Sequence, residues 1–107
     1  GLPENPFHAL AKSQMVNGFG GMVSFKIRGG VENCMTFTNA VTIPTLAVSL
    51  GNVDSLIQHP ASMTHSATPK TEREKAGIVD NIVRLSVGIE NIEDLIADLE
   101  QALAKVH

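Results

Sequence analysis

Arg84 is the residue most clearly able to bind a ligand, because it places one positive charge inside the otherwise apolar segment 82–88. An arginine side chain stays charged in proteins and is rarely buried without a partner. Its planar guanidinium matches a carboxylate or a phosphate through two parallel hydrogen bonds. Arg84 is therefore either a solvated charge on the wet face of a sheet or a binding group for an anionic ligand. Ser86 lies on the same face of the predicted strand and could help to orient the guanidinium.

Other polar residues allow chemistry, but each also has a structural interpretation. Ser49 stands near the end of a predicted strand, where it is either a turn serine or a donor to an anion. His59 and His65 lie six residues apart without cysteines or clustered carboxylates nearby, which favours ordered loop histidines over a metal site. A Ser-His-Asp set built from Ser49, His65 and Asp80 would be arbitrary, because no nucleophile-elbow motif is present.

Cys34 falls on the apolar side of a predicted helix, which favours a buried structural thiol over a catalytic one. The glycine-rich segment 18–21 follows a helix rather than a strand and contains no phosphate-loop lysine, so we interpret it as a turn. The sequence thus offers an anion-binding group without a complete catalytic set.

Four helices are predicted to position these residues. The first spans about residues 7–17, with Asn5 as its cap and Pro6 at its first position. A second spans 31–39, and a short third helix opens on a capping box at Thr71 and stops at Gly77. The last helix begins after its cap, Asn91, and carries a continuous apolar stripe of Ile92, Leu95, Ile96, Leu99 and Leu103.

Strands are predicted where apolar and polar residues alternate, at 22–27, 45–50 and 82–88, with a further short strand at 55–59. The polar segment 60–69 is expected to be an ordered loop. Strands with one apolar face suit a small, mostly antiparallel sheet covered by helices on a single face. We therefore predict an α+β fold of two layers. The uncovered face of the sheet would carry small or polar residues, namely Ser24, Thr45, Ala47, Ser49, Arg84 and Ser86.

The composition narrows the class of protein. A chain of 107 residues is enough for one small domain. Its net charge of −3 argues against nonspecific binding to nucleic acid, and no apolar run approaches the roughly 20 residues of a membrane span. A single cysteine cannot form an internal disulfide, so a cytoplasmic location is the default expectation.

Three segments, in order, make the sequence resemble the C-terminal domain of the Cys/Met-metabolism family of pyridoxal-phosphate (PLP) enzymes. They are LAVSLG at 46–51, IQHPASMTH at 57–65 and VRLSVG at 83–88. The resemblance extends over residues 20–96. The family includes methionine γ-lyase, cystathionine γ-synthase, cystathionine β- and γ-lyases and O-acetylhomoserine sulfhydrylase. Segment 58–65 looks most like methionine γ-lyase.

The resemblance implies an aspartate-aminotransferase-like fold, in which a large domain holds PLP and a small C-terminal domain supplies part of the substrate pocket. Arg84 matches the arginine that binds the substrate α-carboxylate. Ser49 matches the serine beside that carboxylate, and Thr64 matches a loop threonine that helps to hold the arginine. Such a contact would orient the α-proton of an amino acid for removal.

The resemblance also implies what this chain lacks. Residues 1–6 are expected to be a linker from a missing large domain, and residues 7–107 a C-terminal substrate-binding domain. No lysine falls in a cofactor motif, so we expect no catalytic, cofactor-binding or metal-binding residues here and no activity from the chain alone. Segment 66–71 also departs from the common Thr-Pro-Glu-Glu pattern of the family.

The function implied is that of a sulfur-amino-acid lyase performing a methionine γ-lyase-like α,γ-elimination. The expected partners are the PLP-binding large domain, a sulfur amino acid and further copies of the protein, because the full-length family forms tetramers. Neither nucleic acid nor membrane is expected. Two alternatives stay open: γ-replacement, as in cystathionine γ-synthase or O-acetylhomoserine sulfhydrylase, and a stand-alone, non-catalytic binding domain of the same fold.

Overall fold

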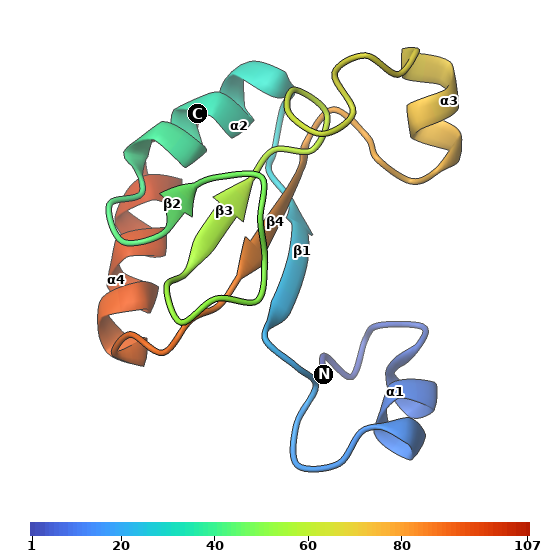
Figure 1. Ribbon diagram of the computed structural model, residues 1–107, viewed down its shortest axis with the longest axis vertical. Coiled ribbons are helices and arrows are strands. Elements are labelled where there is room, and N and C mark those ends of the chain that lie inside the picture. Colours follow the sequence, from blue (N-terminus) through green and yellow to red (C-terminus); the bar gives the residue numbers. More distant parts are fainter.

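A four-stranded sheet forms the centre of the computed structural model, which describes residues 1–107 (Figure 1). The strands are arranged in the order β1 (Met22–Lys26), β4 (Ile82–Ser86), β3 (Leu56–Gln58) and β2 (Thr45–Leu46). Strand β4 is antiparallel to β1 and to β3, whereas β2 runs parallel to β3. The prediction of a mostly antiparallel sheet is confirmed.

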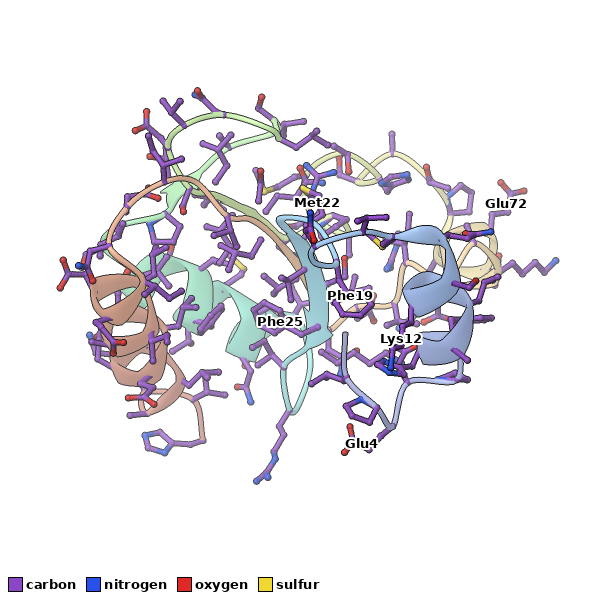
Figure 2. All side chains as sticks on the ribbon, turned by 90° about the horizontal axis from the view of Figure 1, so that it is seen from below. Glu4, Lys12, Phe19, Met22, Phe25 and Glu72 are labelled. Carbon is purple, nitrogen blue, oxygen red and sulfur yellow. The ribbon has the colours of Figure 1, made fainter.

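Two helices cover one face of this sheet, and two short helices lie outside that layer. Helices α2 (Val31–Ala40) and α4 (Ile92–Leu103) pack together on one side of the strands, whereas α1 (His8–Gln14) and α3 (Lys70–Lys75) lie at the periphery (Figure 1). Figure 2 shows α1 across β1 from the α2–α4 layer. The predicted α+β fold with helices on one face is therefore confirmed. No helix in the structure is both long enough and apolar enough to cross a membrane.

The core lies between the sheet and the helical pair. Phe37 of α2 is fully buried against the strand residues Ile57 and Val83 and against Ala102 of α4. Phe25 of β1 points toward the same helix (Figure 2), and its ring meets Phe37 edge-on at a centroid distance of 5.7 Å. Because side chains alternate along a strand, the intervening residues of the same strands project from the opposite, uncovered face.

One predicted strand is much shorter in the structure. The segment 45–50 pairs with β3 only at Thr45–Leu46, and residues 47–54 form a loop. The loop leaves β3 because its backbone bonds elsewhere: the Ser49 carbonyl accepts from Arg84, and the Gly51 N–H donates to Ser86 Oγ. Consequently the predicted apolar face of this segment is exposed, by 45% at Leu46, 59% at Val48 and 55% at Leu50. The other predicted strands are present and shorter by one or two residues.

Helix α1 is shorter than predicted and is not capped as predicted. It ends at Gln14 rather than at Asn17, which has a positive φ of 61°. The N-cap is Phe7, without a side-chain cap, and Asn5 Oδ1 instead accepts from the Phe7 N–H in the preceding turn. No residue of α1 is buried, so its predicted apolar stripe faces away from the core.

The predicted capping box at Thr71 is wrong. Helix α3 begins at Lys70 after Pro69, and the Glu72 and Arg73 N–H groups donate to the Pro69 carbonyl. Thr71 is therefore already inside the first turn, where its hydroxyl caps nothing.

Asn91 is the cap of α4, as predicted, and its Oδ1 accepts from the Glu93 and Asp94 N–H groups. The stripe on α4 is only partly buried, however. Leu95 is buried, whereas Ile92, Ile96 and Leu103 are exposed. The face of the helix that lies toward the core instead contains Leu95, Asp98 and Ala102. Asp98 belongs there because it accepts hydrogen bonds from the backbone that follows α2.

Candidate functional site

Arg84 lies in the centre of the uncovered face of the sheet. The strand register places it between Ser24 of β1 and Gln58 of β3. Its Nη2 donates to the Ser49 carbonyl and to Gln58 Oε1, both at 3.0 Å. No residue of the chain accepts from Nε or Nη1, and neither atom is fully buried. The half-buried guanidinium is thus fixed at one nitrogen and has free N–H donors at the other two.

A line of hydrogen bonds extends from Arg84 into the loop that follows β3. Gln58 is only 2% exposed, and its Nε2 donates to Thr64 Oγ1 at 3.2 Å. Thr64 Oγ1 in turn lies 2.8 Å from His65 Nδ1. Thr64 is therefore linked to Arg84 through Gln58 and does not contact it directly.

A hollow of about 290 Å³ opens beside this line of residues. Eight residues line it: Ser24, Gln58, Pro60, Thr64, His65, Ile78, Ile82 and Arg84. The structure thus brings Arg84 and Thr64 to one hollow. Ser49 does not line the hollow but contacts Arg84 through its backbone carbonyl, and the hydroxyl of this exposed residue makes no hydrogen bond within the chain. A positively charged group in a hollow with polar neighbours can bind a small anion.

The loop that carries Ser49 is held in place by contacts near the ends of β3 and β4. Glu90 accepts from the Ser55 N–H at 2.6 Å and from the Ser55 hydroxyl at 2.8 Å, and these bonds lower the pKa of Glu90. Ser55 Oγ also accepts from the Gly88 N–H. A Cβ atom at Gly88 would lie 2.2 Å from the Val53 carbonyl oxygen, so only glycine permits this close approach. The loop is consequently ordered without regular secondary structure.

Ser86 has a different role from the predicted one. It is buried, and its hydroxyl accepts from the Gly51 N–H at 2.8 Å. The expectation that it orients Arg84 directly is not met. Ser86 stabilises the loop whose Ser49 carbonyl holds the guanidinium, so its contribution is indirect.

The loop histidines are ordered, in agreement with the structural interpretation. His59 is buried, with Nδ1 2.7 Å from Ser62 Oγ and Nε2 2.7 Å from the Asp80 carbonyl. The Asp80 side chain pairs with Lys70 and with the buried Arg73, and hydrogen bonds from these two cations lower the pKa of Asp80. No three His, Cys, Asp or Glu residues are grouped so that they could hold a metal ion. These contacts fix the loop that presents Thr64.

Cys34 is fully buried in the core, and its burial raises the pKa of the thiol. This matches the predicted structural role. The sequence alone did not assign roles to Gln58, which contacts Arg84, or to Glu90, which binds Ser55 at the end of the loop that carries Ser49. Alternation along the strand could have placed Gln58 near the site, but only the register of β3 against β4 pairs it with Arg84.

The residues that line the hollow at Arg84 do not fit PLP bound as an imine. An imine with the PLP aldehyde requires a lysine amine. No lysine lines the hollow at Arg84, and Lys70 is engaged by Asp80 and Glu74 on the outside of α3. No reaction step can therefore be assigned to a cofactor held by these residues.

Comparisons with known proteins place the chain in a family. Residues 1–104 match the family described as Cys/Met metabolism PLP-dependent enzyme. L-methionine gamma-lyase from Fusobacterium nucleatum subsp. polymorphum is 58% identical over 106 residues, which are 99% of this chain and 27% of that protein.

Two solved structures agree with this match. Cystathionine gamma-lyase from Lactobacillus plantarum, complexed with L-serine, superposes with a TM-score of 0.87 at 50% identity over 99% of this chain. Cystathionine gamma synthase from Xanthomonas oryzae pv. oryzae, in complex with aminoacrylate and cysteine, also gives a TM-score of 0.87, at 48% identity over 98% of this chain. The chain spans 27% of each of these structures, about a quarter of their length. This likeness fits the predicted aminotransferase-like α+β fold. The chain belongs to the Cys/Met metabolism family of PLP-dependent enzymes.

Proposed function

We propose that residues 7–107 form the C-terminal, substrate-binding part of a sulfur-amino-acid lyase that performs a methionine γ-lyase-like α,γ-elimination, and that residues 1–6 link it to a large domain. The 58% identity with a methionine gamma-lyase supports this assignment. The large domain would hold PLP, which supplies an electron sink when bound. In this proposal the 107 residues alone are inert.

The free N–H groups of Arg84 are the observation on which the proposal rests. The guanidinium is held by Ser49 and Gln58 through Nη2, while Nε and Nη1 stay available beside the hollow. A substrate α-carboxylate bound there would form charge-assisted hydrogen bonds. Holding the carboxylate fixes one end of the amino acid, and together with the attachment of its amino group it restricts the direction of the α-proton.

Ser49 and Thr64 would support this contact in different ways. The Ser49 carbonyl holds Arg84, and its unpaired hydroxyl is free to donate to the carboxylate. Thr64 acts from the other side, because it binds the Gln58 amide that contacts the guanidinium. The chain thus contributes binding and orientation, and the chemistry takes place on groups outside it.

Exposed apolar side chains support the proposed partners. Phe7, the N-cap of α1, and Leu10 on α1 are 69% and 55% exposed, and the apolar residues of the loop after β2 are exposed to a similar degree. Several large apolar side chains exposed on one segment are typical of an interface. We infer that the large domain and further copies of the protein cover it in a cytoplasmic homo-oligomer, a tetramer as in the full-length family.

Substitution of Arg84 in the full-length enzyme tests the proposal. Removing one partner of a charged, hydrogen-bonded contact costs about 2–5 kcal/mol, so Arg84→Gln should lower kcat/KM for the amino acid sharply. Arg28→Gln is the matched control, because Arg28 is an exposed arginine with no side-chain hydrogen bond. Unchanged kcat/KM in Arg84→Gln would reject the proposed role.

The alternative reactions differ in their products. Release of methanethiol from L-methionine alone would support elimination. Turnover of an activated homoserine only in the presence of a second thiol substrate would support the γ-replacement of a synthase or a sulfhydrylase, an alternative kept open by the equal TM-score of the synthase structure. Tight binding of L-methionine by the 107 residues without a partner would favour a stand-alone binding domain.

A further inference from the structure

We propose that Gln58 is the positioning residue that sets the orientation of Arg84 toward the substrate carboxylate, an inference that rests on the proposed function. Gln58 is the side chain directly opposite Arg84 in the antiparallel pair of β3 and β4. Its Oε1 accepts from Arg84 Nη2 at 3.0 Å. The other acceptor of Nη2, the Ser49 carbonyl, belongs to an exposed loop residue. Gln58 is therefore the only buried group that fixes the guanidinium.

The direction of each hydrogen bond in this line follows from the chemistry of the side chains. A guanidinium can only donate, so Gln58 must turn its oxygen to Arg84 and its NH2 group to Thr64. Thr64 Oγ1 accepts from that NH2 group and can donate its own O–H to His65 Nδ1. In each hydrogen bond of this line, a donor therefore faces an acceptor. Both ends of the Gln58 amide are satisfied, as a side chain that is only 2% exposed requires.

This arrangement prepares Arg84 before the substrate arrives. A free arginine side chain has many rotamers, and ordering them on binding would weaken the affinity. Two acceptors on Nη2 remove part of that freedom in advance and leave Nε and Nη1 beside the hollow. Without the Gln58 acceptor, only the Ser49 carbonyl would hold the guanidinium.

Substitution of Gln58 in the full-length, PLP-loaded enzyme tests this inference. Gln58→Met keeps a similar length and volume but removes the acceptor. Because hydrogen bonds to charged groups contribute substantially, we expect KM for L-methionine to rise about ten- to hundredfold, with a smaller change in kcat. Gln58→Glu keeps an oxygen toward Nη2, and the Thr64 hydroxyl can rotate to donate to it. This variant should recover most of the loss.

A pair of inhibitors separates positioning from a merely structural effect. L-norleucine carries an α-carboxylate, whereas n-pentylamine is the same molecule without it. In Gln58→Met, inhibition by L-norleucine should weaken by the same factor as KM rises, and inhibition by n-pentylamine should stay unchanged. An equal weakening of both inhibitors would overturn the inference, because the substitution would then have disturbed the whole pocket.

Arg84→Gln in the same assays distinguishes the two possible failures. If Arg84→Gln weakens L-norleucine selectively but Gln58→Met does not, the positioning role of Gln58 is wrong and the carboxylate site stands. If Arg84→Gln has no effect on L-norleucine, the proposed function itself fails. Should Gln58→Met not fold, Thr64→Val is the second variant, because it removes the acceptor of the Gln58 NH2 group and leaves Gln58 itself in place. It should cause a smaller loss with the same selectivity, and a loss without selectivity would overturn the inference.

Discussion

Replacing Asp98 should destabilise the protein more than replacing any exposed carboxylate of the same helix. Asp98 Oδ2 accepts from the Thr42 and Ile43 N–H groups at 2.9 and 2.8 Å. Its Oδ1 accepts from the Thr42 hydroxyl at 2.8 Å and from Gln101 Nε2 at 3.0 Å. Asp98 thus joins the middle of α4 to the backbone that leaves α2.

The expected loss of stability on replacing Asp98 follows from these contacts. Asp98→Asn can keep one oxygen toward the two backbone N–H groups but loses the charge and the Gln101 contact, so we expect a loss of about 2 kcal/mol in the free energy of unfolding. Asp98→Ala leaves both N–H groups without an acceptor, and we expect about 4 kcal/mol. Glu100→Gln is the control on the same helix, because Glu100 is exposed and should stay within about 0.5 kcal/mol.

The effect should also depend on pH. Burial raises the pKa of Asp98, but hydrogen bonds from the Ile43 N–H, the Thr42 hydroxyl and N–H, and Gln101 together lower it by more, so that the net shift is downward. A carboxyl whose pKa is lower in the folded state stabilises that state above its unfolded pKa of about 3.9. This contribution is lost as the pH falls through the folded pKa.

Equilibrium urea unfolding followed by far-ultraviolet circular dichroism measures these differences. The difference in the free energy of unfolding between wild type and Asp98→Asn should reach its full value at neutral pH. It should become smaller as the pH falls below the unfolded pKa of Asp98. A difference in the free energy of unfolding below about 0.5 kcal/mol at neutral pH, or a difference that increases on acidification, would refute the reasoning.

Three further predictions concern the stability of the fold and the reactivity of its cysteine. Gly88→Ala should lower the free energy of unfolding by about 1–3 kcal/mol in the same urea assay, because its Cβ would lie 2.2 Å from the Val53 carbonyl oxygen. Arg73→Ala should cost about 2 kcal/mol because this buried guanidinium holds the segment between α3 and β4 through the Ile78 carbonyl and Asp80, whereas Lys70→Ala, its exposed neighbour in the same ion-pair network, should cause no measurable loss. An equal effect of the two would contradict the difference in burial. Cys34 should resist thiol reagents in the native protein and react on unfolding, as mapped by mass spectrometry, because burial raises its pKa.

The alternation of residues was enough to predict the two faces of the sheet. Val83 and Leu85 face the helices while Arg84 faces away, as the pattern of β4 indicates. This success has a simple cause: a strand with period two must turn every second side chain to the same side. The cap at Asn91 was also predictable, since an asparagine before an acidic first turn is a local signal.

Contacts that depend on distant residues could not be predicted. The segment 45–50 has the alternation of a strand, but the side chains of Arg84 and Ser86 bind its backbone and turn it into a loop. The alternation does not reveal those partners, which lie 35 positions along the chain. The role of Gln58 was missed for the same reason, because only the pairing of β3 with β4 brings it to Arg84. Conversely, Leu46, Val48 and Leu50, which the alternation places on one face of the predicted strand, are exposed and available to an interface.

A crystal structure of the full-length, PLP-loaded enzyme with a bound amino acid would test the central claim most directly. We predict that the α-carboxylate lies within hydrogen-bond distance of Arg84 Nε or Nη1, while Nη2 keeps its contacts with Gln58 and Ser49. An amino acid whose carboxylate binds another cation, with Arg84 directed away from it, would contradict the account.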